Sequence, residues 1–313
     1  MRTAPVWILC LGAAVVLAGC GDGDSSTTTG GAGAGAGGGA GGGTTTGTST
    51  GGAGGGGGSG GGSAEWKPII EATWQLAPGT EKTSDFHVTT LEKDTYVGAI
   101  RPIAPPGTHH TVLALGGFGA GQIIYASGVG TNPVTFPKGV GLKLPAGETI
   151  ILQLHLFNPS AEDLTGKSGI EIIEVDPADV QEEADLFLPG PNDFTIPPNT
   201  EYKHVGTCTA GAKQNIFAIF PHMHQLGSHF KTTLNIGGVD QVLHDDEYAF
   251  DHQAFIPFEP ITLEPGDKVT TECTWKNTTT QTVTWGESST SEMCFSILYR
   301  YPAQGNNGGF CNK

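Results

Sequence analysis

The chain has 313 residues, with 31 acidic side chains against 15 lysines and arginines, and its formal net charge is −16 at pH 7. This balance argues against nucleic acid as a partner, because the phosphate backbone attracts basic side chains. It suits a soluble surface in an extracytoplasmic space.

The first 19 residues have the pattern of a secretory signal. Arg2 precedes an apolar run over residues 6–18, which is shorter than the roughly 20 apolar residues that span a bilayer. The run ends in LAGC at 17–20, which resembles a bacterial lipobox and makes Cys20 the expected lipidation site. We therefore expect an exported protein, lipid-anchored to a bacterial membrane at its periplasmic face or at the cell surface. An ordinary signal peptide with a chance cysteine is the alternative.

Residues 20–63 consist almost entirely of Gly, Ser, Thr and Ala. Such a segment has nothing to bury, and we predict a disordered linker. Residues 64–313 remain, enough for one large or two medium domains.

The folded part is predicted to be all-β. Short apolar runs rich in Val, Ile, Thr and Phe alternate with clusters of Gly, Pro, Asn and Asp. The predicted strands are residues 111–115, 149–157, 170–175, 216–220, 231–236, 268–275 and 295–301. Two antiparallel sandwiches fit this pattern better than a barrel or an α/β fold.

The acidic segment 176–185 interrupts the strands and predicts a boundary between domains over 64–180 and 181–313. This segment can form one short helix, because Pro177 suits a first turn.

Four cysteines fall in the folded part, and all of them lie in about the last third of the chain: Cys208, Cys273, Cys294 and Cys311. An even number in an exported protein indicates two disulfides, and spacing alone leaves all three pairings open. A cysteine zinc site is the alternative, although no CxxC pair is present.

The strongest local signal is PHMH at 221–224. His222 and His224 share one face of a strand roughly 7 Å apart, so both can reach one metal ion. Imidazole binds copper, zinc, iron or nickel. Met293 offers a thioether, a soft ligand that favours Cu(I), although a core side chain is the plainer interpretation.

A second group begins at His109 and His110, directly after a Pro-Gly turn. Neighbours on a regular strand point to opposite faces, so both can bind one metal only where the backbone is irregular. His155, on another predicted strand, can complete a site of three imidazoles. Buried histidines bonded to the backbone are the alternative. The five remaining histidines are expected at the surface or in ordinary hydrogen bonds.

Several enzyme classes lack their signatures in this chain. It contains no GxSxG elbow, phosphate loop, HExxH helix or dinucleotide fingerprint after a strand.

The order HH, LHLF, PHMH and EMC over residues 74–302 resembles the copper type II, ascorbate-dependent monooxygenases. The resemblance implies two jelly-roll domains in tandem with one copper each and ascorbate, or another electron donor, as co-substrate. It assigns His109, His110 and His155 to an electron-transferring copper. It assigns His222, His224 and Met293 to a catalytic copper that binds dioxygen and hydroxylates a C–H bond. It also implies disulfides Cys208–Cys311 and Cys273–Cys294.

The chain departs from the peptide-amidating members of that family at three positions. Their carboxylate-binding Arg, Asn and Tyr are replaced by Phe220, Phe295 and Ile297. We therefore predict a small-molecule or apolar organic substrate, with an apolar or aromatic group that fits these three residues at its pocket.

Two other functions remain open. The first is a non-catalytic copper-binding or electron-transfer lipoprotein on the same fold. The second is a metal-free adhesion or carbohydrate-binding module built from two sandwiches.

Overall fold

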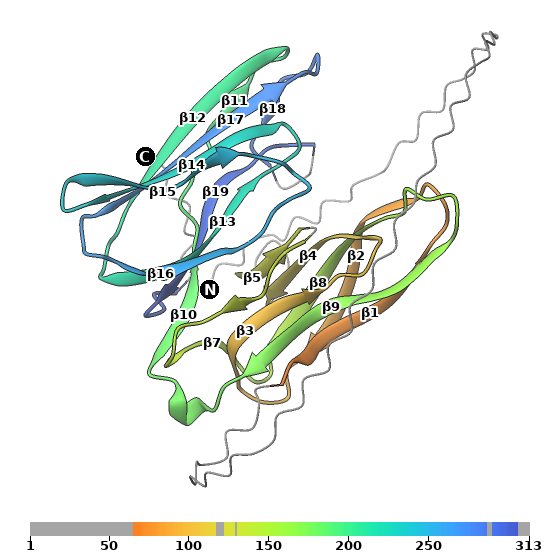
Figure 1. Ribbon diagram of the computed structural model, residues 1–313, viewed down its shortest axis with the longest axis horizontal. Coiled ribbons are helices and arrows are strands. Elements are labelled where there is room, and N and C mark those ends of the chain that lie inside the picture. Colours follow the sequence, from red (N-terminus) through yellow and green to blue (C-terminus); the bar gives the residue numbers. More distant parts are fainter. Residues whose placement is uncertain (1–64, 117–121, 129, 287–289, 306–313) are drawn as a thin grey trace, which may run out of the picture. The chain divides into compact units, whose positions relative to one another are not determined.

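The computed structural model describes residues 65–116, 122–128, 130–286 and 290–305, and these residues form an all-β fold (Figure 1). The all-β prediction is confirmed; six of the seven predicted strands lie within observed strands, and the seventh, 170–175, extends one residue beyond the observed strand Leu164–Glu174. The described residues include no helix with the length and apolarity that a membrane span requires. The predicted signal segment, Cys20 and the predicted linker lie outside the described residues.

The N-terminal half is built from two facing sheets. One has the strand order β1-β9-β3-β7, with β6 paired to β3, and the other has the order β2-β8-β4-β5. The strands are β1 (Lys67–Leu76), β2 (Glu81–Thr90), β3 (Thr95–Ile103), β4 (Thr108–Leu115), β5 (Gln122–Ser127), β6 (Val134–Thr135), β7 (Val140–Leu144), β8 (Thr149–Phe157) and β9 (Leu164–Glu174).

The C-terminal half repeats the arrangement with sheets ordered β10-β19-β13-β16 and β12-β17-β14-β15. Its strands are β10 (Glu182–Phe187), β11 (Thr195–Ile196), β12 (Thr200–Thr209), β13 (Gln214–Met223), β14 (Gly227–Ile236), β15 (Val239–Glu247), β16 (Ile256–Leu263), β17 (Lys268–Asn277), β18 (Val283–Thr284) and β19 (Cys294–Tyr301). Strands β7 and β10 pair in parallel, so one nine-stranded sheet runs through both halves.

The segment between the halves contains the short helix that Pro177 suggested. It is a 3-10 helix, η1 (Pro177–Asp179), capped by the side chain of Asp176, and it takes up only part of residues 176–185. Strand β10 then begins at Glu182 and pairs with β7. The pairing takes up the backbone groups that a longer helix needs, and it buries Ala184 in the core.

Strand β8 alternates between buried and outward-facing positions. On β8, Ile150, Leu152, Leu154 and Leu156 are fully buried, which leaves His155 on the other face. A strand that is anchored by four apolar side chains holds its outward residues at fixed positions.

The two halves also share a detail of their hydrogen bonding. Asn158 follows β8 and Asn277 ends β17, and each donates from its amide nitrogen to three backbone carbonyls. Each amide oxygen accepts from the backbone N–H and hydroxyl of the residue two positions later, Ser160 and Thr279. The same side chain therefore closes the corresponding loop in both halves.

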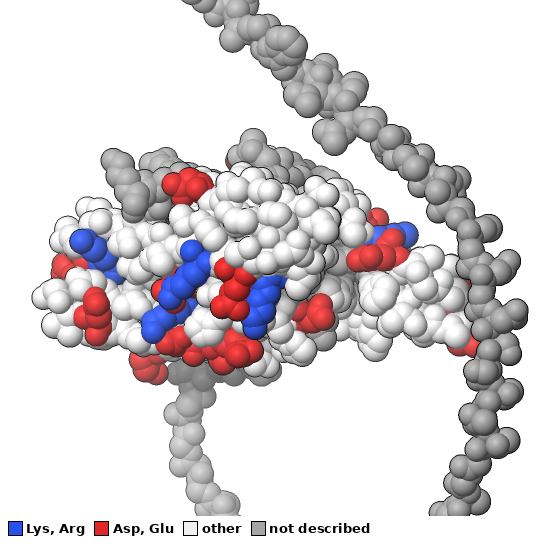
Figure 2. Space-filling view, turned by 90° about the horizontal axis from the view of Figure 1, so that it is seen from above, with Lys and Arg blue, Asp and Glu red and all other residues white. Residues whose placement is uncertain are grey.

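The charged surface is mixed despite the acidic balance. On the face seen in Figure 2, basic side chains lie beside acidic ones. Ion pairs such as Lys203–Glu272 at 2.5 Å and Lys231–Asp245 at 2.6 Å show this pairing in detail. Exposed pairs of this kind stabilise the fold only slightly.

Candidate functional site

Three histidines of the N-terminal half converge at the pairing of β4 with β8. His110 lies directly opposite His155, and the register shifts between Thr108 and His110, so His109 is the extra residue of a β-bulge. A bulge re-aims a side chain that regular alternation would send to the other face. One ring nitrogen from each of these histidines, hereafter the three-histidine cluster, lies within 4.8 Å of the other two.

The rings of the three-histidine cluster present the same nitrogen to one another. Nδ1 of His109 lies 2.9 Å from Nδ1 of His110, which in turn lies 3.3 Å from Nδ1 of His155. The arrangement leaves the three Nε2 atoms pointing outward.

Each outward Nε2 meets an oxygen that only accepts hydrogen bonds. The acceptor for His109 is Asp251 Oδ1 at 2.9 Å. The acceptor for His110 is the carbonyl oxygen of Phe250 at 3.2 Å, and the acceptor for His155 is Glu81 Oε1 at 2.6 Å. Each Nε2 therefore carries the ring hydrogen, and each Nδ1 keeps its lone pair. Three lone pairs facing one another repel, so the geometry favours a cation among them. Oxygen acceptors behind metal-binding imidazoles are the usual support of such sites.

His110 is held neutral by its surroundings. Burial, reinforced by His109 and His155, lowers the pKa of His110 from 6.5 to about 3. Neutral imidazole is the form that binds copper and other transition metals.

The second group of predicted ligands lies where β13 pairs with β19. His222 is opposite Phe295, and Met223 is opposite Cys294. The described pairing ends there: His224 and Met293 are the next residues and lie just beyond the ends of β13 and β19, so the grouping of Met293 with His222 and His224 stays a prediction. Met293 is partly buried and packs against the main hydrophobic core.

His222 and His224, hereafter the histidine pair, have ring centroids 5.2 Å apart. His222 donates from Nδ1 to Gln253 Oε1 at 2.8 Å, and His224 donates from Nδ1 to the carbonyl of Ser291 at 2.9 Å. These bonds assign the lone pair of each ring to Nε2. Burial and the neighbouring His224 lower the pKa of His222 to about 3, so this ring is neutral at pH 7.

Glu292 holds the backbone around the histidine pair, and the sequence analysis missed it. Its side chain is fully buried and accepts from the backbone N–H groups of His224 and Leu226 at 3.0 and 2.7 Å. It also accepts from the Trp275 indole at 2.8 Å. Burial raises its pKa to about 7, against the opposing effect of these donors. An isolated acidic residue beside Met293 was the available signal.

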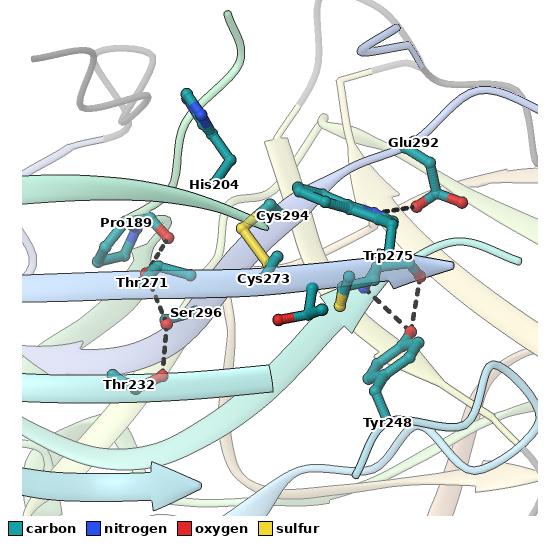
Figure 3. The surroundings of a disulfide bond; sticks show 12 residues. Pro189, His204, Thr232, Tyr248, Thr271, Cys273, Trp275, Glu292, Cys294 and Ser296 are labelled. Atoms are coloured by element: carbon teal, nitrogen blue, oxygen red, sulfur yellow. Dashed lines mark hydrogen bonds between the residues drawn. A yellow bond between two sulfur atoms is a disulfide. The ribbon is translucent and has the colours of Figure 1, made fainter. Parts of the chain in front are cut away.

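A disulfide fixes the other face of the same strand. Cys273 of β17 is bonded to Cys294 of β19, which joins the two sheets of the C-terminal half and confirms that predicted pair. Figure 3 shows the Trp275 indole pointing at Glu292 close to this bridge. Cys311, the predicted partner of Cys208, lies outside the described residues, so that pairing stays a prediction.

The three residues predicted to line a substrate pocket are buried in the core. Phe220 and Phe295 are 2% exposed and Ile297 is 5% exposed. The ring of Phe255 covers Phe220 at a centroid distance of 4.9 Å. Their role toward substrate stays a prediction.

An open cavity of about 410 Å³ adjoins the three-histidine cluster. It is lined by Glu81, His109, His155, Phe157, Gln225, Phe250 and Asp251. The cluster is thus reachable from solvent on this side. Phe220, Phe295 and Ile297 do not line this cavity.

The segment 248–255, hereafter the bridging segment, is the largest feature that the sequence did not reveal. It connects β15 to β16, and it supplies Phe250, Asp251 and Gln253 to both histidine groups. No metal-ligand spacing marks these residues, because they act on the far side of the imidazoles.

Residues 183–312 match the family model for the C-terminal domain of copper type II ascorbate-dependent monooxygenases. The matched range includes the histidine pair, Met293 and the Cys273–Cys294 disulfide.

Curated relatives point to the same family. The chain is similar to DBH-like monooxygenase protein 1 of Mus musculus, 31% identical over 206 residues, which cover 58% of this chain and 33% of the relative. It is 26% identical to tyramine beta-hydroxylase of Caenorhabditis briggsae over 206 residues, which cover 58% of this chain and 34% of that relative. For dopamine beta-hydroxylase of Canis lupus familiaris the identity is 26% over 205 residues, which cover 58% of this chain and 32% of that relative. The chain spans about a third of the length of these relatives.

Among solved structures, the major capsid protein P2 of bacteriophage PM2 aligns with 76% of this chain and 100% of its own at 10% identity, with a TM-score of 0.33. The sequence matches, and not this structural likeness, support the copper type II ascorbate-dependent monooxygenase family for this chain.

Proposed function

We propose that this protein is a copper-dependent monooxygenase that hydroxylates a C–H bond of an organic substrate, using dioxygen and a reductant such as ascorbate. The observation that carries the proposal is the convergence of three Nδ1 lone pairs, at 2.9 and 3.3 Å, in a chain whose second half matches this family.

The donor atoms fit copper at both places. His109, His110 and His155 would hold one ion, and His222, His224 and Met293 would hold the other. Copper supplies one-electron chemistry and, when reduced, reacts with dioxygen, whereas zinc has no redox chemistry.

The protein side chains prepare these positions before any metal binds. Burial keeps His110 and His222 neutral, so no proton has to leave them at pH 7. Asp251 and Glu81 hold the outward hydrogens of two imidazoles and orient the rings. The thioether of Met293 would favour the reduced metal at the histidine pair.

The proposal includes a jelly-roll topology for each half, with domains over 64–180 and 181–313. Its support is the matching strand order of the two halves, in which eight strands divide into two facing four-stranded sheets.

For the substrate we propose a small apolar molecule. Phe220, Phe295 and Ile297 would offer it an apolar floor beside Phe255, whose ring packs against Phe220. A peptide ending in a free carboxylate finds no basic side chain among these three. Rapid amidation of a glycine-extended peptide by the copper-loaded protein would contradict this part of the proposal.

We further propose export and lipid anchoring through Cys20. The acidic net charge is the reason to expect no nucleic-acid partner. Labelled palmitate should be incorporated by the wild-type chain in bacterial cells but not by a Cys20→Ala variant.

Metal analysis and oxygen uptake test the central claim together. We expect two coppers per chain, and ascorbate-supported oxygen uptake that depends on an organic substrate. The burial of the three apolar residues favours one alternative, a copper protein that transfers electrons without turnover. Two coppers with no uptake on a broad set of apolar substrates would support that alternative, and a chain that binds no copper would exclude both.

A further inference from the structure

A continuous chain of hydrogen bonds links the two histidine groups through the bridging segment. His110 donates from Nε2 to the carbonyl oxygen of Phe250 at 3.2 Å. Gln253 donates from its amide nitrogen to the same oxygen at 3.0 Å, and its own oxygen accepts from His222 at 2.8 Å.

The direction of every bond in this chain is determined. The Phe250 carbonyl only accepts, so the amide nitrogen of Gln253 must face it. The amide oxygen is thereby turned toward His222, whose Nδ1 has to carry the hydrogen. The tautomers of His110 and His222 are therefore set by one backbone carbonyl and one amide. Gln253 is 3% exposed, which shields these bonds from competition with water.

The bridging segment is anchored at both ends. At one end, the Tyr248 hydroxyl donates to the carbonyl of Met223 at 2.6 Å and accepts from its N–H at 3.0 Å. At the other end, the ring of Phe255 lies against Tyr125 and Tyr299, with centroids at 5.7 and 4.8 Å.

Between these anchors, the N-terminal half holds Gln253 directly. The Gly128 N–H donates to the carbonyl of Gln253 at 2.9 Å, and the Thr131 hydroxyl donates to the same oxygen at 2.9 Å. A Cβ added at Gly128 would lie 2.9 Å from both the backbone nitrogen and the backbone oxygen of Gln253. This approach therefore requires glycine at position 128.

We infer that Gln253 is a positioning residue for both histidine groups and that its amide, with the Phe250 carbonyl, is the path of electronic coupling between them. The electron-transfer part rests on the proposed function. If copper occupies both groups, an electron that follows this path would oxidise the ion at the three-histidine cluster from Cu(I) to Cu(II) and reduce the ion at the histidine pair from Cu(II) to Cu(I). Every hydrogen stays on its nitrogen, so no proton accompanies the electron.

The first test uses metal-free protein and does not depend on copper. In Gln253→Leu the His222 Nδ1–H loses its acceptor, and its nuclear magnetic resonance signal should shift and exchange faster with water. The exposed Gln241→Leu is the matched control and should leave that signal unchanged. An unchanged signal in Gln253→Leu would overturn the positioning role.

The second test separates the coupling path from simple support. Gln253→Glu keeps an acceptor for His222 but, when ionised, has no hydrogen for Phe250. After reduction by one electron per chain, the copper-loaded variant should lose the fast phase of electron transfer between the metals, even when its rate is compared with wild type at the same difference in reduction potential. A fast phase equal to wild type would overturn the path.

Gly128→Ala tests the role of Gln253 by changing the residue that contacts its backbone. Its added methyl group displaces Gln253, so both the His222 signal and the fast phase should change. Gly211→Ala, where a Cβ meets nothing within 4 Å, is the control. A wild-type chain that holds no copper would contradict the proposed function, but the metal-free measurements on Gln253 would still decide the positioning role.

Discussion

The backbone N–H of His224 donates to the buried carboxylate of Glu292 at 3.0 Å. The same carboxylate receives Leu226 N–H and the Trp275 indole at 2.7 and 2.8 Å. A single side chain thus fixes the backbone on which one member of the histidine pair stands. Met293 follows Glu292 directly in the sequence. The positions of two predicted metal ligands, His224 and Met293, therefore depend on Glu292.

Replacing Glu292 by leucine should cost stability as well as metal binding. Three N–H donors would be left in the core without an acceptor, and each such loss costs about 1–3 kcal/mol. We expect the free energy of unfolding of the metal-free protein, measured in urea, to fall by roughly 3 kcal/mol or more. Glu201→Leu, at an exposed position of β12, should change it by no more than about 0.5 kcal/mol. Equal losses in the two variants would contradict the role given to Glu292.

The metal-free protein should lose stability in mild acid because of His110 and His222. Their folded pKa values of about 3 lie below the ordinary 6.5, so the unfolded chain binds more protons between those limits. Each histidine therefore contributes stability above pH 6.5 that is lost as the pH falls toward 3, by at most about 1.4 kcal/mol per pH unit. His222→Asn should flatten this slope, as measured by urea unfolding at a series of pH values.

Glu292 has the opposite dependence. Its folded pKa of about 7 lies above the ordinary 4.5, so its contribution is complete below pH 4.5 and is lost as the pH rises through 7. The effect of the two histidines and the effect of Glu292 on stability can be separated, because Glu292→Gln removes only the loss of stability as the pH rises through 7. A slope between pH 3 and 6.5 that is the same in wild type and His222→Asn would refute the assignment.

The sequence predicted the strands well because their signal is local. The alternation on β8 that places His155 outward is visible in the residues themselves. The pairing of His110 with His155 was harder to predict, because it depends on a bulge at His109 that no residue type marks.

Residues behind the imidazoles were the least predictable part of the candidate site. Gln253 and Asp251 are ordinary polar residues in a connecting segment, and only the fold brings them to histidines more than 25 positions away. The short helix suggested at Pro177 is present as the 3-10 helix Pro177–Asp179, and the pairing of β10 with β7 follows it closely.

Removing the acceptor of an outer ring nitrogen should weaken metal binding at the three-histidine cluster. Glu81 accepts from His155 Nε2 at 2.6 Å and holds the ring with its Nδ1 inward. We expect Glu81→Leu to raise the Kd for copper at this cluster by roughly 10–100-fold, measured by titration. The exposed Glu92→Leu is the control. Equal affinities in both variants would show that the carboxylate does not orient the ring.

The Cys273–Cys294 disulfide should stabilise the fold and the histidine pair together. It closes a loop of 21 residues, for which the chain-entropy model gives roughly 3 kcal/mol. The double variant Cys273→Ala/Cys294→Ala should lose about that much stability in urea unfolding. Copper affinity should fall at the histidine pair, while the three-histidine cluster, which lies in the other half, keeps its affinity. A loss shared equally by both groups would contradict a local role for the bridge.

The chain contains a matched pair of methionines that tests the thioether directly. Met223 pairs with Cys294 and is fully buried, whereas Met293 directly precedes β19 and is the predicted ligand at the histidine pair. Met293→Ile removes the soft ligand, so oxygen uptake should fall. We expect a loss of at least roughly 10–100-fold, which is the usual cost of losing a residue that supports a metal ligand. Copper at the three-histidine cluster should be retained, as electron paramagnetic resonance can verify. Met223→Ile alters a core side chain of similar volume and should preserve uptake, with a stability cost below about 1.5 kcal/mol. Activity that survives Met293→Ile but not Met223→Ile would reverse the assignment, because the thioether would then matter for packing and not for the metal.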